Sequence, residues 1–214
     1  MADVTIVGAG NMARGIATRL LAGGAVVRIV APTIEHATNL ADELGRTGGS
    51  VTGTGLQEPL RGEVVVLATP YEAALDVVST RGDELDGKIV VDISNPVDWA
   101  TFDRLVTPAD SSAAEEIAKR LPSDAPVVKA FNTTFAGTLG IGEVGGQQLD
   151  VFLAGDDEDA KATVARLVKA GGLNAIDTGP LRRARQLEQL GFLHMALQDK
   201  LGTGFGSTIK IITG

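Results

Sequence analysis

The chain has 214 residues, no cysteine and a formal net charge of −8, and these features exclude several classes of protein. Disulfide frameworks and cysteine metal sites need thiols, and two histidines are too few for a multi-histidine metal site. Nucleic-acid and anionic-membrane binding need clustered lysine and arginine, which argues against both. Neither a basic leader before an apolar region nor an apolar run of membrane-spanning length is present, so a cytoplasmic protein is expected.

Short apolar runs alternate with amphipathic stretches through the first 132 residues, the pattern of strands joined by helices. Strands are predicted over residues 4–8, 25–31, 50–53, 63–70, 88–96 and 126–132. Helices are predicted over residues 12–24, 33–45, 71–80 and 110–121, the last with a capping-box pattern at Ser112 and Glu115. Repetition of strand, helix and strand requires parallel pairing through right-handed crossovers. The predicted fold is therefore α/β, a Rossmann-type doubly wound parallel sheet.

The rest of the chain continues this pattern on a smaller scale. It predicts a strand over 150–155, a helix over 157–172, a strand over 174–179, a long helix over 181–201 and a terminal strand within 202–214. We expect a dinucleotide-binding Rossmann domain over residues 1–133 and a small C-terminal α/β region over residues 134–214 that completes the cofactor and substrate cleft. No linker marks this boundary, which rests on the pattern alone.

The stretch GAGNMARG, residues 8–15, follows the first predicted strand and opens the first predicted helix. Gly8, Gly10 and Ala13 fit the pattern G-x-G-x-x-A. The first glycine permits a tight turn, the second lets the backbone approach a pyrophosphate, and the small third residue lets helix and strand pack closely. We expect a dinucleotide here rather than a purely structural turn. The residues expected to bind it are Gly8, Ala9, Gly10, Asn11 and Met12.

The end of the second predicted strand normally determines which dinucleotide binds. An acidic residue there bonds the ribose 2′-hydroxyl of NAD, and a basic residue receives the 2′-phosphate of NADP. This chain has Ala31 and Pro32 at that place, so NADP is permitted and NAD is not excluded. Thr33 can bond a phosphate or merely cap the next helix. His36 and Arg14 can supply positive charge, or His36 can be an ordinary surface residue. Ala31, Thr33 and His36 are expected to line the cofactor site.

Ligands of an open parallel sheet bind outside the carboxyl ends of its strands, where this chain places loops of neutral residues. The residues expected to line the site there are Ala68, Thr69, Pro70, Asn95, Pro96, Asn132, Thr133, Thr134, Phe135 and Ala136. These loops hold no carboxylate pair, Ser–His arrangement or lysine base, and no metal is expected. Hydride transfer between two bound cofactors needs positioning and exclusion of water more than a strong acid or base. The alternative is that Pro70, Asn95 and Asn132 merely form turns.

Five further residues have more than one interpretation. Asp92, at the end of a predicted strand, is expected to bond loop amides rather than act as an acid or base. Lys129 can contact a ligand or pair with an acidic neighbour. Trp99 and Phe102 can cover a planar ring or pack in the core. His194, on the apolar face of the last helix, is expected to be a buried histidine with satisfied hydrogen bonds.

Segments from residue 8 to residue 193, among them VVKAFNTTFAGTL and DTGPLRRARQLEQLGFL, resemble the NADPH-dependent reductases of the deazaflavin coenzyme F420. The resemblance implies an oxidoreductase that uses NADP and coenzyme F420, and usually a homodimer. It also implies a nicotinamide close to Thr134 and Ala136, with the deazaflavin stacked across it and side chains that only position the cofactors. The ferric reductase domains of mammalian Steap proteins share the fold and a similar KAFN segment.

The resemblance has one departure and one rival. Family members that prefer NADP have Ser-Arg where this chain has Ala31-Pro32, a Lys in place of His36 and a Thr in place of Ala9. The start GAGNMARGIATRLLAGG also resembles pyrroline-5-carboxylate reductase, which has a longer helical dimerisation domain. The preferred hypothesis is hydride transfer between NAD(P)H and F420 or a flavin-like acceptor. The alternatives are a non-catalytic NAD(P)-binding protein and an imine or small-carbonyl reductase.

Overall fold

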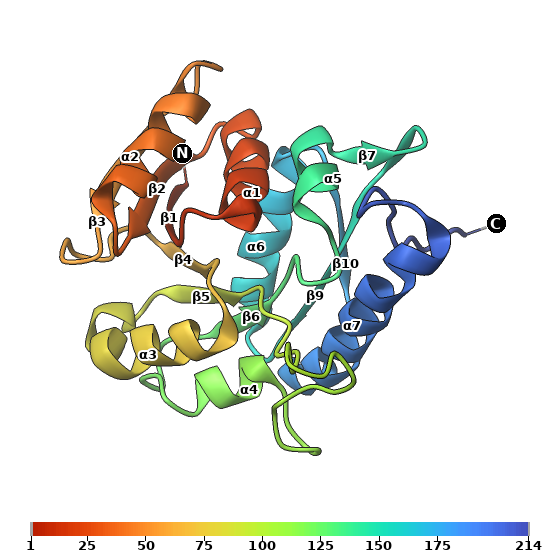
Figure 1. The fold of residues 1–214 in the computed structure, drawn as a ribbon. Coiled ribbons are helices and arrows are strands. Elements are labelled where there is room, and N and C mark those ends of the chain that lie inside the picture. The colour runs from red at the N-terminus through yellow and green to blue at the C-terminus, as the bar shows by residue number, and fades with distance from the viewer. Residues whose placement is uncertain (1, 214) are drawn as a thin grey trace.

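The computed structural model describes residues 2–213, which form an eight-stranded sheet with helices on both faces (Figure 1). Its strands are β1 (Asp3–Val7), β2 (Val26–Ala31), β3 (Val51–Gly55), β4 (Val64–Leu67), β5 (Ile89–Asp92), β6 (Val127–Lys129), β9 (Asp150–Gly155) and β10 (Asn174–Asp177). The order across the sheet is β10-β9-β6-β5-β4-β1-β2-β3, parallel throughout except between β6 and β9. The chain moves outward from β1 to β3 and then returns to β4, so the switch in strand order lies between β1 and β4. The predicted fold class is confirmed.

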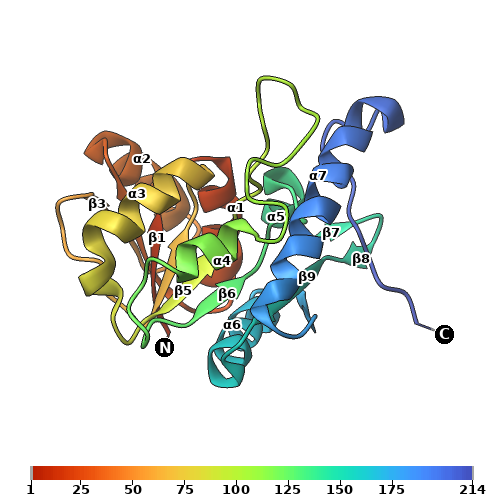
Figure 2. The same cartoon turned by 90° about the horizontal axis from the view of Figure 1, so that it is seen from below.

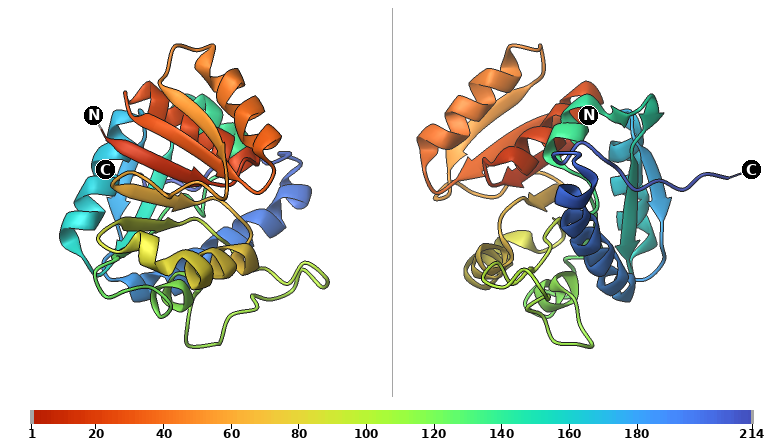
Figure 3. Two further views of the ribbon diagram at one scale, coloured as in Figure 1. Left: turned by 90° about the vertical axis from the view of Figure 1, so that its left-hand side faces the viewer. Right: turned by 45° about the vertical axis from the view of Figure 1, so that its right-hand side comes forward.

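Two layers of helices enclose the sheet, as the left panel of Figure 3 shows. One face is covered by α1 (Asn11–Ala22), α2 (Ile34–Gly45), α5 (Ala136–Ile141) and α6 (Glu158–Ala170). The other face is covered by α3 (Tyr71–Arg81) and α4 (Ala113–Ala118). The long helix α7 (Ala184–Leu201) follows a 3-10 turn at Leu181–Arg183 and packs on β9 through Leu187.

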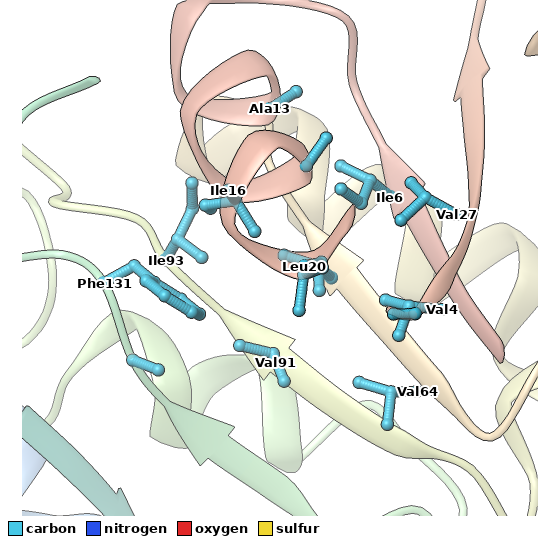
Figure 4. Close-up of a cluster of buried hydrophobic side chains, with 14 of the residues drawn as sticks. Val4, Ile6, Ala13, Ile16, Leu20, Val27, Val64, Val91, Ile93 and Phe131 are labelled. Atoms are coloured by element: carbon cyan, nitrogen blue, oxygen red, sulfur yellow. The ribbon is translucent and has the colours of Figure 1, made fainter. Parts of the chain in front are cut away.

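Successive side chains of a strand point to opposite faces of the sheet. The buried residues therefore form two main clusters, one under each layer of helices. Val64 and Val66 of β4 belong to the cluster under α1, whereas Val65 and Leu67 belong to the cluster under α3. Figure 4 shows the first cluster, with Ile16 of α1 beside the strands. Strands buried on both faces read as continuous apolar runs, which is why the sequence marked them clearly.

Most predicted elements are confirmed, but two differ. The helix expected over 110–121 is shorter, Ala113–Ala118. It begins there because the Ser112 hydroxyl accepts a hydrogen bond from the amide of Glu115 (3.2 Å), which makes Ser112 the N-cap. The expected terminal strand is not formed within residues 202–213. There the Ile211 amide donates to the Asp150 carboxylate (2.8 Å) rather than to a strand carbonyl, and Gly214 lies outside the described residues. The sequence also missed α5 and the hairpin of β7 (Glu143–Val144) and β8 (Gln147–Gln148).

Two segments leave the compact body. Residues 93–112 form a long connection from β5 to α4, part of which is seen in Figure 2 as the loop that projects beside α7. An isolated bridge between Val97 and Leu105 closes its base. The segment after α7 turns back along β9, where Ile209 packs against the cluster of Phe152 and Ala154, and its end then projects from the molecule (Figures 1 and 3). Among the helices that residues 2–213 form, none combines the length and apolar character needed to cross a membrane.

Candidate functional site

A cleft of about 970 Å³ lies at the carboxyl ends of β1, β4, β5 and β6. This edge of an open parallel sheet is where ligands bind. The predicted site residues that line the cleft are Gly10, Asn11, Met12, Ala68, Thr69, Pro70, Asn95, Pro96, Asn132, Thr134, Phe135 and Ala136. We call residues 93–98 and 132–137 the inner loops, and residues 31–36, after β2, the outer loop. The tertiary structure thus brings together segments that are far apart in sequence.

The turn after β1 has the geometry that a phosphate-binding loop requires. Gly8 has a φ of +122°, and a Cβ there would overlap the carbonyl oxygen of Ala68. A Cβ on Gly10 would meet no heavy atom of residues 2–213 within 4 Å. Gly10 is the N-cap of α1 and makes no side-chain capping bond. The first amides of α1 are therefore free to bind an anion in the cleft.

Helix α1 also touches the second inner loop. A Cβ on Gly15 would lie 2.8 Å from the carbonyl oxygen of Ala136 and 2.9 Å from the Cβ of Leu139. Ala13, the third position of the glycine pattern, is fully buried against the core. Small residues along α1 therefore set the spacing between the glycine turn and the loop after β6.

Six predicted site residues do not line the cleft; Ala31, Thr33 and His36 belong to the outer loop, and the other three lie in the loops beside the cleft. Gly8 is buried beneath the turn, and Ala9 packs against the core of the α1 layer. Thr133 is buried, and its carbonyl oxygen lies 3.3 Å from Nδ1 of His194. These residues therefore shape the loops and do not line the cleft.

The outer loop lies apart from the cleft. Ala31 is buried, whereas Thr33 and His36 are exposed. Thr33 occupies the N-cap position of α2, but its side chain makes no capping hydrogen bond, so capping does not account for it. Arg14, the other candidate cation, forms an ion pair with Glu43. The outer loop therefore has exposed candidates for contact with a 2′-phosphate, and Pro32 and Ile34 line a hollow of about 530 Å³ beside it, but residues 31–36 contain no arginine.

Two asparagines join the inner loops to each other and to α7. Asn95 Nδ2 donates to the carbonyl oxygen of Asn132 (2.7 Å), and Asn132 Nδ2 donates to Asn95 Oδ1 (2.9 Å). Asn132 Nδ2 also donates to the carbonyl oxygen of Leu187 (2.8 Å). One turn further along α7, a Cβ on Gly191 would lie 2.7 Å from Asn95 Oδ1. Glycine at this position lets the helix approach the asparagine pair.

Buried charges lie behind the inner loops. Lys129 Nζ donates to Asp92 Oδ2 (2.7 Å), to Glu188 Oε1 (2.7 Å) and to the carbonyl oxygen of Ser94 (2.5 Å). Asp92 Oδ1 accepts hydrogen bonds from the amide (2.9 Å) and the hydroxyl (2.6 Å) of Ser94. All three charged side chains are at most 1% exposed. Asp92 thus bonds a loop amide as expected, and Lys129 pairs with acidic neighbours instead of reaching a ligand. The sequence missed Glu188.

These charges influence one another strongly. Burial alone would lower the pKa of the Lys129 ammonium, but the carboxylates of Asp92 and Glu188 raise it above its usual value. Burial raises the pKa of the Glu188 carboxyl, and the Lys129 ammonium opposes that rise. The amide of Ala113, at the start of α4, also donates to Glu188 Oε2 (3.0 Å). The cluster therefore links β5, β6, α4 and α7.

Aromatic side chains line the side of the cleft that faces α7. Trp99 lines the cleft and is 70% exposed, so the core-packing interpretation is wrong for it. Its ring centroid lies 5.8 Å from that of Phe102, which lies 5.4 Å from that of Phe192. Phe205, from the segment after α7, packs edge-on against Phe135 at 5.0 Å. This side of the cleft offers surface to a planar ring.

His194 supports this aromatic side from α7. Its ring stacks on Phe135 at 4.3 Å, and its Nε2 lies 2.8 Å from Oγ of Ser207. The side chain is 5% exposed, and burial lowers the pKa of its imidazole. The expectation of a buried, hydrogen-bonded histidine is confirmed.

Several lining residues were not predicted. They are Tyr71, Glu72, Ile93, Ser94, Val97, Asp98, Val106, Gly137, Met195, Gly204 and Phe205. Tyr71, Ser94 and Gly137 directly follow or precede predicted residues, so extending each strand-end loop would have found them. Met195 and Phe205 belong to α7 and the segment behind it, and no local pattern indicates that these reach the cleft.

Three polar groups remain for a ligand. Thr69 Oγ1 and Asn132 Oδ1 are buried without a hydrogen-bond partner within residues 2–213, and buried polar atoms normally have one. Burial, with a smaller contribution from the Glu116 carboxylate, raises the pKa of Tyr71 to about 12. Its hydroxyl therefore stays protonated at neutral pH and can donate a hydrogen bond beside the cleft.

Comparison with known proteins agrees with this geometry. The family model described as "NADP oxidoreductase coenzyme F420-dependent" matches residues 3–96. An F420-dependent NADP reductase of Methanocaldococcus jannaschii is 32% identical, with 94% of this chain and 95% of that protein covered. The chain belongs to this family. A second such reductase, from Methanothermobacter marburgensis, is 30% identical over 90% of each chain.

The chain is also similar to proteins with other names. Metalloreductase STEAP3 of Rattus norvegicus is 30% identical over 87% of this chain, which spans only 36% of that protein. A solved structure of a candidate F420-dependent NADP-reductase from Arthrobacter covers all of both chains with a TM-score of 0.84 and 29% identity. A pyrroline-5-carboxylate reductase from Coxiella burnetii, with a TM-score of 0.61 and 20% identity over 97% of this chain and 72% of its own, shares the fold alone.

Proposed function

We propose that this protein transfers a hydride between NADP(H) and coenzyme F420. The observation that carries the proposal is the cleft itself, which joins a glycine turn with free helix amides to neutral inner loops and an aromatic side. Family membership supports the same reaction, since the full-length relatives are F420-dependent NADP reductases. Two planar cofactors stacked in one cleft need positioning more than acid–base groups, and the inner loops supply only neutral groups.

The residues present fit a dinucleotide. The free amides at Asn11 and Met12 would hold the pyrophosphate, and Gly10 leaves room for it. The buried, unpartnered oxygens of Thr69 and Asn132 offer hydrogen bonds that residues 2–213 leave unused. Asn132 Nδ2 is committed to two acceptors, so its Oδ1 is the atom left to accept from a ligand.

The nicotinamide is proposed to lie at the inner loops, close to Thr134 and Ala136. Bound together, the two cofactors supply the chemistry, with hydride donated by the dihydronicotinamide and accepted by the deazaflavin. The chain would position the two rings and exclude water, with Trp99, Phe135 and Phe205 offering aromatic surface from the lining of the cleft. No side chain of the cleft is assigned a proton-transfer role.

Further expectations from the sequence stay part of the proposal. NADP is proposed as the dinucleotide. NAD is not excluded, because Ala31, Thr33 and His36 make a weak site for the 2′-phosphate. Residues 1–133 would bind the dinucleotide, and residues 134–214 would complete the cleft and contribute to a homodimer. A cytoplasmic location also stays a prediction.

Purified protein mixed with NADPH and F420 tests the proposal, with deazaflavin absorbance as the readout. Bleaching that requires both NADPH and protein is expected, and NADH is expected to support slower turnover. Parallel reactions replace F420 with FMN or with a cyclic imine. Turnover with the imine alone would replace the proposal with imine reduction. Tight NADPH binding without turnover on any acceptor would indicate a non-catalytic binding protein.

A further inference from the structure

The buried cluster of Asp92, Lys129 and Glu188 contains two carboxylates and one ammonium, so its negative charges outnumber its positive one. It lies directly behind the wall of the cleft. Ser94, which lines the cleft, accepts a hydrogen bond from Lys129 through its carbonyl oxygen and donates two to Asp92. One residue therefore separates the cluster from the space proposed for the nicotinamide.

Stability alone does not explain this cluster. Burial removes each charge from water at a cost that mutual attraction rarely recovers, and apolar side chains of similar size are often at least as stable. Only part of the Glu188 charge is offset, by Lys129 and by the amides of Ala113 (3.0 Å) and Ala114 (3.5 Å).

The surroundings do not neutralise the excess negative charge. The charged residues that line the cleft, Glu72 and Asp98, are both acidic, and its lining within residues 2–213 contains no lysine, arginine or histidine. Arg185, which follows the start of α7, is paired with Glu115 at 2.6 Å. The cluster and the cleft lining together therefore carry a net negative charge, and burial reduces the screening of the cluster by water.

We propose that the Asp92–Lys129–Glu188 cluster selectively stabilises the oxidised, cationic nicotinamide ring at the inner loops over the neutral, reduced ring. The inference rests on the proposed function. Hydride transfer moves one hydrogen with both bonding electrons from the dihydronicotinamide to the deazaflavin, which also takes one proton from water. The donor ring is left as a pyridinium cation. A fixed negative charge beside that ring favours its formation and makes bound NADPH a stronger reductant.

Binding of the two redox forms separates this role from scaffolding. The readout is quenching of Trp99, the single tryptophan of the chain, which lies in the cleft. Glu188→Gln keeps the size and the carbonyl acceptor but removes one negative charge. We expect the ratio of the dissociation constants, NADP⁺ over NADPH, to rise about 3- to 10-fold. A purely structural role would weaken both forms equally and leave the ratio unchanged.

A matched control and a second variant complete the test. Glu158→Gln makes the same charge change on α6, where the side chain is 79% exposed, and should leave the ratio unaltered. Asp92→Asn should raise the ratio as Glu188→Gln does, which covers the case that one variant does not fold. In the wild type, NADP⁺ should bind at most about tenfold more weakly than NADPH. A larger deficit there, or an unchanged ratio in a folded variant, overturns the inference.

Nucleotide binding and F420 reduction by the wild-type protein test the proposed function independently of the electrostatic inference. If the wild-type protein binds neither NADPH nor NADP⁺, the proposed function fails. If it binds both and reduces F420 while the ratio is insensitive to Glu188, only the electrostatic inference fails.

Discussion

The inner loops and the outer loop are parts of the same proposed cofactor site, yet the fold holds them very differently. The inner loops are tied down by an asparagine pair, by Lys129 and by contacts with α7. The outer loop follows β2 with exposed Thr33 and His36 and makes no comparable side-chain contact among the described residues. This contrast indicates that the position of the reacting ring is built into the core, whereas the choice between NADP and NAD depends on a few surface groups.

The largest effect is expected for Gly8→Ala, in the turn between β1 and α1. The added Cβ would overlap the carbonyl oxygen of Ala68, and φ is +122°. We expect the free energy of unfolding to fall by about 3 kcal/mol or more. Chemical denaturation followed by circular dichroism measures this. Wild-type stability in the variant would mean that the turn does not require glycine at this position.

Gly10→Val is the matched change at the second glycine, and it should damage binding but not folding. No heavy atom of residues 2–213 lies within 4 Å of the new Cβ position. Its side chain would instead occupy the space of the pyrophosphate. We expect about 100-fold weaker NADPH binding, roughly 2.8 kcal/mol, with an unchanged melting temperature. Binding as tight as in the wild type would place the pyrophosphate elsewhere.

Gly191→Ala probes the contact between α7 and the inner loops. The new methyl group would lie 2.7 Å from Asn95 Oδ1 and 2.8 Å from the carbonyl oxygen of Asn132. Displacement of the helix should cost about 1–3 kcal/mol of stability and raise the KM for NADPH at least as much as the KM for F420, because Asn132 belongs to the proposed dinucleotide site. Gln189→Ala, at an exposed position of the same helix, is the control and should change neither constant. An unchanged KM for NADPH would argue that α7 does not position the inner loops.

Pro32→Arg tests the outer loop. A guanidinium at this exposed position can contact a 2′-phosphate, which NAD lacks. We expect the preference for NADP over NAD to increase about tenfold, near 1.4 kcal/mol, and the gain to shrink at high salt. Competitive binding of the two dinucleotides measures the preference. An equal gain for NAD would show that the outer loop does not face the 2′ position.

The smallest expected effect concerns His194 and pH. Burial holds the pKa of the folded imidazole below that of the unfolded chain, so the unfolded state takes up the proton first as pH falls. This contribution to stability is complete above the unfolded value of about 6.5 and is lost progressively below it. Melting temperatures between about pH 7.5 and 5.5 should fall less in His194→Gln than in the wild type. His36→Gln, at the exposed histidine, should behave as the wild type does.

Much of the site could be predicted because parallel strands end at one edge of a sheet. Once β1, β4, β5 and β6 were recognised, the loops after Val7, Leu67, Asp92 and Lys129 had to meet. The pairing of Asp92 with Lys129 was foreseen only as one alternative, since neither spacing nor residue type selects a partner across the fold. Glu188 lies 59 residues beyond Lys129 on a helix, and no local pattern marks it as buried.

The sequence by itself determined the α/β fold, the glycine turn and the set of neutral strand-end loops, because hydrophobic periodicity and glycine spacing are local properties. The tertiary structure decided what closes the cleft and what lies behind it. Phe205 reaches Phe135 because α7 ends and its following segment turns back, and Glu188 reaches Lys129 because α7 packs over β6 and β9. Such contacts depend on the three-dimensional path of a helix across the sheet, which no stretch of its own residues encodes.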